Sequence, residues 1–377
     1  MSPHRSSTDL SAGKRVVVKI GSALLVDEAR GTVHRQWLNS LADDVADMRA
    51  RGQEVIIVSS GAIGVGRHHL NFGKAGPLTL RQSQAAAAAG MGRLVHAYQE
   101  ALGQHDIGVG QILVTLDDSE NRRRYINARN TVATLLEAGA VPLINENDTV
   151  ATDEIRFGDN DRLAARVAAM VSADTLVLLS DIDGLYTADP GKDEGAKHIP
   201  VVDEITPEIE AMGGGSGTSY GSGGMVTKLA AARICLGSGC RMVIAHGAAS
   251  HPLKRIAEGE KTTWFIPSAT PTGARKQWIA NSLKPSGTVT LDAGALKALK
   301  DGKSLLPIGV IAITGSFERG ASVRVTGPDG EEVARGLIAY PSDDAKKIVG
   351  KRSGDIEAAL GYIGRKELIH RDDLVLV

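Results

Sequence analysis

The sequence contains only two cysteines, Cys235 and Cys240, and this scarcity removes one class of fold at once. Two cysteines cannot form the disulfide framework of a small secreted protein. Their C-x4-C spacing does not fit a zinc knuckle, and no nearby cysteine or histidine pair would complete one. We therefore predict that both are packing residues, with Cys235 ending a helix and Cys240 opening a strand.

Aromatic residues are also scarce, long apolar runs are absent and the charge is balanced. Aromatics form 3% of the chain, so Ala, Val, Leu and Ile must fill its core. The formal net charge is -1, which gives no general attraction to nucleic acid or to an anionic membrane. No apolar run approaches the roughly 20 residues of a membrane span, and Met1–Gly13 lacks the apolar core of a signal peptide. We expect a cytoplasmic protein without a membrane anchor.

Short β-rich runs alternate with helical stretches over the first two-thirds of the 377 residues, a length that suggests two or three domains. The runs are continuously rich in Val, Ile and Leu, as expected of strands that are buried on both faces. The predicted strands are Arg15–Ile20, Glu54–Val58, Ile107–Val114, Val141–Ile144, Thr175–Leu179 and Arg241–Ala245. The predicted helices are His34–Arg51, Gln82–Gln104, Asn121–Ala138, Asp161–Ser172 and Met225–Leu236. This alternation is typical of an α/β fold with a mainly parallel sheet sandwiched by helices.

The composition changes near residue 285. Residues 271–285 hold Pro271, Pro285 and several polar residues, and short β-like pieces separated by Gly-rich turns follow them. Those pieces are Thr288–Leu291, Gly309–Thr314, Ser322–Thr326, Glu332–Ala339 and Leu368–Val377. The predicted organisation is a polar tail at 1–13, an α/β domain at 14–270, a linker at 271–285 and a small β-rich domain at 286–377.

Several predicted strands are followed directly by residues that can bind anions or polar ligands. Lys19, Gly21 and Ser22 come at the end of the first strand, at the carboxyl edge where parallel sheets bind ligands. Gly21 lets the backbone approach a phosphate, and Ser22 adds a hydrogen-bond donor. Taken alone, the pattern also fits a solvated lysine before a turn.

Two further clusters follow buried strands in the same way. Ser59–Gly64 supplies either donors for an anionic substrate or a helix cap in a tight turn. Asn145–Asp148 places four polar side chains after a strand, which is more than a single cap requires. This second cluster indicates hydrogen bonding to a polar ligand, with Asp148 suited to an ammonium group.

Two acidic clusters admit two interpretations each. Asp159–Asp161 precedes a predicted helix, and only one of its carboxylates is needed as a cap. The other could orient catalytic lysines or support a hydrated Mg²⁺. Ser180 and Asp181 follow a buried strand, where nucleotides bind in open α/β sheets, although an Asp-Gly turn is the simpler local interpretation.

The segment Met212–Gly224 is rich in glycine and precedes a predicted helix that begins at Met225. Out of context it fits a flexible linker. Glycine backbone that leads into a helix N-terminus is, however, a phosphate-binding arrangement. Lys228 lies in the first turn of that helix, where its charge opposes the helix dipole unless an anion is nearby. This segment gives the strongest local indication of a phosphate site.

In their order and separations these motifs resemble those of the amino-acid-kinase family, and within it the glutamate 5-kinase group. The resemblance runs from about residue 14 to the end of the chain. Its C-terminal part is similar to the PUA domain that many bacterial members of this group append. The matching segments are Val17–Ser22, Val58–Ile63, Asn145–Asp148, Gly158–Leu163, Gly184–Pro190 and Gly223–Lys228.

The resemblance implies transfer of the γ-phosphoryl group of ATP to the γ-carboxylate of L-glutamate, with Mg²⁺ accompanying the nucleotide. It implies that Lys19 stabilises the transferring phosphoryl group, that Lys228 stabilises the leaving phosphate, and that Asp161 holds both lysines. The implied glutamate-binding residues are Ser60, Asp148 and Asn160. The implied ATP-binding residues are Lys19, Gly21, Ser22, Ser180, Asp181, Ser222, Gly223, Gly224, Met225, Val226, Thr227 and Lys228. Because the acceptor carboxylate is already a nucleophile, this chemistry needs no general base.

The same resemblance implies partners and regulation. It implies L-glutamyl 5-phosphate as the product, glutamyl-phosphate reductase as its acceptor, inhibition by proline and self-association. It assigns no direct protein ligand to Mg²⁺. Two positions depart from the family pattern: Ala23 replaces a residue that often carries a hydroxyl, and Ser180 replaces a common threonine.

Two alternative functions stay open. A sister kinase that acts on acetylglutamate, aspartate, carbamate or UMP would share most of these motifs. From another class, the PUA-like domain could make this an RNA-binding protein. Residues 286–377 carry 13 Lys and Arg against 13 Asp and Glu, so they lack the basic footprint of an RNA platform. The candidate basic cluster there is Lys346–Arg352, and nucleic acid is not an expected partner.

Overall fold

The computed structural model describes residues 8–27, 30–73, 76–115, 117–118, 121–150, 160–214, 224–282 and 285–376. The chain divides into two compact units. Unit 1 comprises Met1–Glu120 and Asn127–Pro271, and unit 2 comprises Asn121–Ile126 and Thr272–Val377. Each unit has its own sheet and its own cluster of buried apolar side chains.

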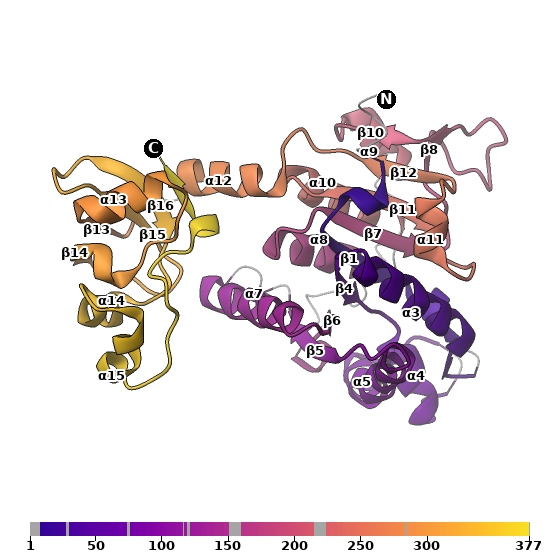
Figure 1. The fold of residues 1–377 in the computed structure, drawn as a ribbon. Helices are drawn as coiled ribbons and strands as arrows, with labels where there is room; N and C mark the ends of the chain where they lie inside the picture. The colour runs from indigo at the N-terminus through magenta and orange to yellow at the C-terminus, as the bar shows by residue number, and fades with distance from the viewer. Residues whose placement is uncertain are drawn as a thin grey trace. The chain divides into compact units, whose positions relative to one another are not determined.

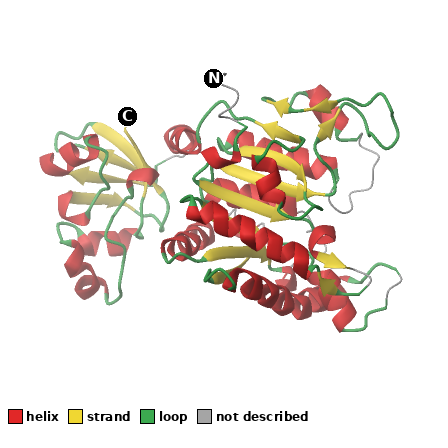
Figure 2. Ribbon diagram, turned by 45° about the vertical axis from the view of Figure 1, so that its right-hand side comes forward, coloured by secondary structure: helices red, strands yellow, loops and turns green. Residues whose placement is uncertain are grey.

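Unit 1 is built on an eight-stranded sheet with the strand order β10-β12-β11-β7-β1-β4-β6-β5. Neighbouring strands are parallel, except for the antiparallel pair β11 and β12. Helices lie on both faces of the sheet (Figure 1 and Figure 2), which confirms the predicted α/β fold. The strands are β1 (Arg15–Ile20), β4 (Glu54–Val58), β5 (Val109–Val114), β6 (Val141–Glu146), β7 (Thr175–Ser180), β10 (Val201–Val202), β11 (Arg241–His246) and β12 (Thr262–Phe265).

The inner strands are apolar along their whole length because both of their faces are covered. Every residue of β6 and β7 is buried, and in β1 only Arg15 is partly exposed. The edge strand β5 differs from the prediction, since Gln111 and Leu113 on it are exposed. An edge strand is covered less completely than its inner neighbours, so its burial alternates.

The helices of unit 1 form two layers. Helix α3 packs against α5 and α11, while α8 packs against α10 and against β1. The helices are α2 (Ser22–Leu25), α3 (Arg35–Ala50), α4 (Ala62–His69), α5 (Leu80–Gly103), α7 (Arg122–Glu137, whose first residues up to Ile126 belong to unit 2), α8 (Asn160–Met170), α9 (Pro207–Met212), α10 (Met225–Gly237) and α11 (Pro252–Ala257). Two 3-10 turns, η1 (Leu10–Ala12) and η2 (Asp148–Val150), also belong to this unit. It contains two short antiparallel ribbons as well: β2 (Val26–Asp27) pairs with β3 (Thr32–Val33), and β8 (Leu185–Tyr186) pairs with β9 (His198–Ile199).

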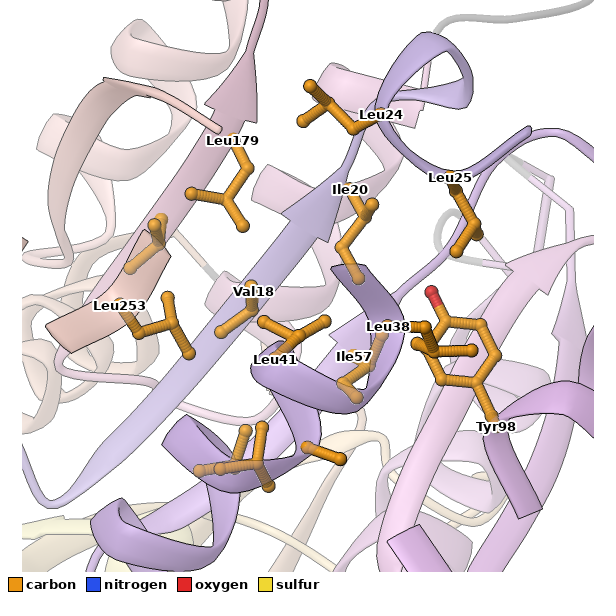
Figure 3. Packing of buried hydrophobic residues seen from close by; sticks show 14 of the residues in the cluster. Val18, Ile20, Leu24, Leu25, Leu38, Leu41, Ile57, Tyr98, Leu179 and Leu253 are labelled. Carbon is orange, nitrogen blue, oxygen red and sulfur yellow. The ribbon is translucent and has the colours of Figure 1, made fainter. Parts of the chain in front are cut away.

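Successive side chains of β1 point to opposite faces of the sheet, and this alternation decides where its lysine lies. Val18 and Ile20 belong to the core cluster formed with α3 and α5. Figure 3 shows them beside Leu38 and Leu41 of α3. Lys19 lies between Val18 and Ile20 in the strand, so its side chain points to the other face, which α8 and α10 cover.

Helix α4 was not predicted, and its packing against α5 explains why it forms. A Cβ atom on Gly66 would overlap the carbonyl oxygen of Ala86, and one on Gly90 would overlap the carbonyl oxygen of Ala62. The two helix backbones therefore touch where they cross. Glycine and histidine lower the intrinsic helix propensity of this segment, so tertiary contact rather than local preference stabilises α4.

Unit 2 contains a five-stranded sheet with the order β14-β13-β15-β16-β17. Its strands are β13 (Gly287–Leu291), β14 (Val310–Gly315), β15 (Ser322–Thr326), β16 (Glu332–Leu337) and β17 (Leu374–Leu376). Its helices are α12 (Pro271–Ser282), α13 (Ala293–Lys300), α14 (Ser342–Ile348) and α15 (Ile356–Leu360), with 3-10 turns η3 (Pro307–Gly309), η4 (Ser353–Asp355) and η5 (Arg371–Asp373). A core of its own, which includes Val289, Val323 and Tyr340, is buried in this unit.

The segment predicted as a linker, 271–285, contains helix α12. Pro271 occupies the first helical position, where its missing N–H has no consequence. Arg275 of α12 forms a largely buried ion pair with Asp373, with 2.6 Å between Nη2 and Oδ1. This pair joins two elements of unit 2.

Two other sequence features have clear structural counterparts. Cys235 in α10 and Cys240 before β11 are both buried and free, which confirms them as packing residues. No helix in the described part of the chain combines the length and the apolarity needed to cross a membrane.

Candidate active site

The carboxyl ends of β7, β1, β4 and β6 are neighbours in the sheet, and most of the predicted site residues meet there. They surround a cavity of about 870 Å³, a volume typical of small-molecule sites. The predicted site residues that line it are Lys19, Gly21, Ser22, Ser60, Asp148, Asn160, Ser180, Asp181 and Lys228. The strand order thus brings together segments that are far apart in the sequence.

A buried carboxylate bridges two lysines beside this cavity. The ammonium nitrogen of Lys19 lies 2.7 Å from Oδ1 of Asp161, and that of Lys228 lies 3.2 Å from Oδ2. The three residues are 8%, 2% and 3% exposed for Lys19, Asp161 and Lys228. Because each lysine takes one carboxylate oxygen, Asp161 fixes the separation of the two positive charges.

The electrostatics of Asp161 favour its charged form. Burial alone would raise the pKa of this carboxyl, since an apolar environment disfavours a charge. The nearby ammonium groups of Lys19 and Lys228 outweigh burial and hold the pKa below its ordinary value of 3.8. With Asp161 ionised, the three side chains carry one net positive charge, which is suited to an anion.

Local structure places each member of this triad. Asp161 is in the first turn of α8, and Lys228 is in the first turn of α10, the helix that packs against α8. Thr227 Oγ1 lies 2.9 Å from Asp161 Oδ2 and 2.8 Å from the carbonyl oxygen of Gly224, to either of which it can donate. The two helix N-termini therefore meet at the carboxylate.

Asp148 is buried in the same cavity and has no side-chain partner in the described part of the chain. It is 8% exposed, and its side chain makes no hydrogen bond or ion pair with any other described residue. Burial raises its pKa to about 6. An unpaired buried carboxylate is costly, and a bound ammonium group would relieve that cost.

Asn160 connects the start of α8 to the turn after β4. Its Nδ2 donates to Ser60 Oγ at 2.7 Å and to the carbonyl oxygen of Ser59 at 3.2 Å. Its Oδ1 is buried and has no hydrogen-bond partner among the described residues. Behind this pair, the hydroxyls of Ser59 and Tyr98 lie 3.1 Å apart in the core. Asn160 Oδ1 is therefore an acceptor that a ligand donor can use.

Ser180 and Asp181 form the wall at the end of β7. Ser180 Oγ donates to Asp181 Oδ1 at 2.9 Å, and the carbonyl oxygen of Ser180 accepts from the backbone N–H of Gly247 at 2.8 Å. The backbone N–H of Gly21 donates to the carbonyl oxygen of Leu179 at 3.3 Å. These contacts join the turns after β1, β7 and β11.

The glycine-rich segment is only partly described. Ser222 and Gly223 lie outside the described residues, and α10 begins directly after Gly224. No side chain caps α10, and its first turn contains no acidic residue. Gly224, Met225, Val226 and Thr227 do not line the cavity, so their assignment to ATP stays a prediction.

Sequence reasoning missed one wall of the cavity. Arg67 and His68 of α4 line it, followed by Asn71, Phe72 and Gly73. The motif before α4 was recognised, but the helix itself was not predicted, so its later residues were not connected with the site. Asn145 and Glu146, which also line the cavity, are the last residues of β6 rather than part of a loop.

The donor set fits an anionic nucleotide better than a metal held by protein alone. The described residues contain no group of three or more His, Cys, Asp or Glu that could hold a metal ion. Asp161 is occupied by two lysines, while Asp181 is exposed at the cavity wall. A Mg²⁺ ion that arrives on the phosphates of a nucleotide keeps several waters and needs few protein ligands.

Comparison with known proteins agrees with this geometry. The model of the amino acid kinase family matches residues 14–246, and that of the PUA domain matches residues 287–360. The chain belongs to the amino acid kinase family. Among curated members of this family, the glutamate 5-kinase of Paramagnetospirillum magneticum is 63% identical over 367 residues, which cover 97% of this chain and 99% of the relative. The glutamate 5-kinase of Rhodospirillum rubrum is 60% identical, and the match covers 96% of each protein.

Solved structures of kinases resemble this chain at low sequence identity. The carbamate kinase from Giardia lamblia bound to AMP-PNP is 16% identical, with a TM-score of 0.49, and the match covers 69% of this chain and 100% of that protein. The UMP kinase from Bacillus anthracis is 15% identical, with a TM-score of 0.48, and the match covers 68% and 98%.

Proposed function

We propose that this chain transfers the γ-phosphoryl group of ATP to the γ-carboxylate of L-glutamate and forms L-glutamyl 5-phosphate, the first step of proline synthesis. The observation that carries this proposal is the Lys19–Asp161–Lys228 bridge at a cavity that also holds Asp148, a buried carboxylate with no partner among the residues that the structure describes. The bridge suits a phosphoryl group, and Asp148 suits an amino acid. The names of the curated relatives at 63% and 60% identity support the same reaction.

The two lysines act on charge that moves during the reaction. Lys19 stabilises the transferring phosphoryl group, and Lys228 stabilises the phosphate that leaves with ADP. Asp161 holds both ammonium groups in place before the reaction begins, so little reorganisation is needed in the transition state. The γ-carboxylate of glutamate attacks without a general base, because it is already ionised at neutral pH.

Glutamate is held by Asp148, Asn160 and Ser60, whose polar atoms can still form hydrogen bonds with a ligand. The ionised carboxylate of Asp148 accepts from the α-ammonium group, in a charge-assisted hydrogen bond. Asn160 Oδ1 supplies a second buried acceptor, and Ser60 Oγ lies 2.7 Å from the amide nitrogen of Asn160. N-acetylglutamate offers Asp148 only a neutral amide, so this residue favours a free amine.

ATP occupies the side of the cavity near the ends of β1, β7 and α10. Gly21, Ser22, Ser180 and Asp181 line that side. Mg²⁺ binds with the nucleotide and neutralises phosphate charge, and its remaining ligands are waters and phosphate oxygens. Ser222, Gly223, Gly224, Met225, Val226 and Thr227 are assigned to the nucleotide on the resemblance alone.

The setting of the reaction is also a proposal. The protein acts in the cytoplasm as a homo-oligomer, proline inhibits it, and its product passes to glutamyl-phosphate reductase. The two buried cysteines are free, in agreement with a reducing compartment. The domain limits of 14–270 and 286–377 belong to the same proposal.

Trapping of the acyl phosphate tests the reaction. The purified chain is incubated with ATP, Mg²⁺ and hydroxylamine, and hydroxamate formation is compared for L-glutamate, N-acetyl-L-glutamate and L-aspartate, with carbamate and UMP phosphorylation measured as ADP release. We expect L-glutamate to give the highest kcat/KM, at least roughly tenfold above N-acetyl-L-glutamate. A higher kcat/KM for any other acceptor would assign the chain to a sister kinase.

A further inference from the structure

One charge of the proposed substrate has no counterpart among the residues assigned so far. Glutamate carries an α-ammonium group and two carboxylates. Asp148 pairs with the ammonium group, and the γ-carboxylate reacts beside Lys19 and Lys228. The α-carboxylate keeps a full negative charge, and removing it even partly from water without a positively charged partner is costly.

Among the described residues, the cavity lining contains one permanent positive charge besides the two lysines. The described residues that line it include three such side chains, Lys19, Lys228 and Arg67. Both lysines are engaged by Asp161, at 2.7 Å and 3.2 Å. Arg67 makes no ion pair with a described residue, so its charge is available to a ligand.

The guanidinium group of Arg67 is held in place without being neutralised. Its Nε donates to the carbonyl oxygen of Gly73 at 2.8 Å, and its Nη2 donates to the carbonyl oxygen of Gly76 at 3.0 Å. Neither acceptor carries a charge. Within the described part of the chain, Nη1 has no hydrogen-bond partner. Because Nε and Nη2 are held by carbonyl oxygens and Nη1 is left to donate, the guanidinium group is a preorganised donor for a carboxylate.

The rigid position of α4 adds to this preorganisation. Arg67 directly follows Gly66, where the backbone of α4 touches that of α5. The same helix begins after the Ser59–Gly61 turn, so it connects the end of β4 with the Arg67 side of the cavity. A charged group on such a rigid element loses little freedom when a ligand binds.

We propose that Arg67 binds the α-carboxylate of the amino-acid substrate and thereby determines specificity for a free α-amino acid. This inference rests on the proposed function, and it adds the group that recognises the substrate's backbone end. Asp148 and Arg67 then select the ammonium and the carboxylate of one zwitterion. Arg67 is not in the phosphoryl-transfer machinery, so it acts mainly on acceptor binding.

The rival interpretation is that Arg67 only fastens residues 73 and 76 to α4. A substrate pair separates the two roles, because L-isoglutamine keeps the ammonium group and the γ-carboxylate of glutamate but has a neutral amide in place of the α-carboxylate. The measured quantity is the ratio of kcat/KM for L-glutamate to that for L-isoglutamine. A purely structural role changes both values together and leaves the ratio unaltered.

The experiment measures this ratio in the wild-type chain and in Arg67→Gln, Arg67→Lys and Arg93→Gln. We expect a wild-type ratio of at least roughly tenfold, falling to within about threefold in Arg67→Gln, with the KM for ATP little changed. Arg67→Lys keeps the charge but lacks the planar guanidinium group that the carbonyls of Gly73 and Gly76 hold in place, and it gives an intermediate ratio. Arg93→Gln is the matched control, since Arg93 is an exposed arginine on the neighbouring helix α5 and does not line the cavity.

Each outcome decides the inference. A wild-type ratio below about threefold, or an unchanged ratio in a folded Arg67→Gln protein, would overturn the role of Arg67 while leaving glutamate phosphorylation intact. If Arg67→Gln does not fold, Arg67→Lys is used instead, and an unchanged ratio of kcat/KM values in that variant would overturn the role of Arg67. Failure of the wild-type chain to phosphorylate glutamate would contradict the proposed function itself, and the inference with it.

Discussion

The indole N–H of Trp37 donates to the carbonyl oxygen of Gly247 at 2.7 Å, in a buried hydrogen bond between residues 210 positions apart. Trp37 belongs to α3, and Gly247 directly follows β11. The backbone N–H of Gly247 donates in turn to the carbonyl oxygen of Ser180 at 2.8 Å. A Cβ atom on Gly247 would lie 2.5 Å from Leu24 Cδ1, so this glycine also lets the turn after β1 approach. Trp37 thus holds the turn after β11 against the ends of β1 and β7, at the side of the cavity that we propose for the nucleotide.

Replacing Trp37 by Phe should therefore affect both stability and nucleotide binding. The carbonyl of Gly247 loses its donor in a buried place, which costs about 1–3 kcal/mol, and the smaller phenyl ring leaves a small cavity that adds to this cost. We expect a lower urea midpoint by circular dichroism and a several-fold higher KM for ATP, with the KM for glutamate little changed. An unchanged KM for ATP in a destabilised protein would limit Trp37 to a structural role.

Lys19→Ala and Lys228→Ala should each lower kcat far more than they raise the KM for glutamate. Each removes positive charge that matters most in the transition state, and such a loss is worth roughly 3 kcal/mol, or about 100-fold in rate. Steady-state kinetics with varied glutamate measure this. Lys254→Ala is the control, since Lys254 is largely exposed on α11 and its ion pair with Glu258 is long, at 4.0 Å. Near-wild-type kcat in either active-site variant would remove that lysine from the proposed role.

The pKa of Asp148, raised to about 6 by burial, should appear in the pH dependence of glutamate use. The ionised form binds the α-ammonium group, so kcat/KM for glutamate should rise as pH increases through about 6 and level off above it. Asp148→Asn cannot ionise. It should lose at least roughly tenfold in kcat/KM at pH 8 and lack this rise. Identical pH profiles for the two proteins would show that Asp148 does not meet the ammonium group.

The same residue should make the free protein less stable at neutral pH. The carboxyl has a pKa of about 6 in the folded state against the ordinary 3.8, so the folded state binds more protons between these values. The destabilisation is absent below the lower value, grows between the two and is fully present above the higher one. We expect Asp148→Asn to unfold at a higher urea concentration than wild type at pH 8, with the difference vanishing near pH 4. At the same glutamate concentration, the wild-type protein should be stabilised more than the variant, because the variant binds glutamate less tightly.

The crossing of α4 and α5 predicts opposite effects for two glycine substitutions. Gly66→Ala places a methyl group against the backbone of Ala86 and should destabilise the protein by about 1–3 kcal/mol or more. Gly92→Ala on α5 meets no atom within 4 Å and should stabilise by about 0.5–1 kcal/mol, because alanine favours the helix. Thermal unfolding of the two variants side by side measures the difference. Equal melting temperatures would mean that α4 can shift away from α5 without loss.

A chain that ends at residue 270 should keep the site. Every described residue that lines the cavity lies in unit 1. The shortened chain ends before Pro271 rather than after α12, because Arg275 of α12 would lose its ion-pair partner Asp373. Hydroxamate formation by the shortened, folded protein should stay within about tenfold of the full chain. A folded but inactive protein would show that unit 2 contributes to turnover.

Local sequence patterns predicted the inner strands well. β1 and β4 begin and end where the apolar runs do, at Arg15–Ile20 and Glu54–Val58. Each run is buried on both faces and is followed at once by Gly, Ser or another small polar residue, so composition and structure change together. The position of Lys19, Ser60 and Ser180 at one edge of the sheet also followed from strand order in a parallel fold.

Other features depend on contacts between distant segments and have no local signature. Helix α4, and with it Arg67, forms because its glycines meet the backbone of α5. The sequence determined which chemical groups stand at the strand ends, because burial, turn formation and strand direction are set by neighbouring residues. Only the tertiary structure decided that each lysine takes a different oxygen of Asp161 while Asp148 is buried without a partner among the described residues, because the energy of a buried charge depends on which charges the fold brings within about 4 Å.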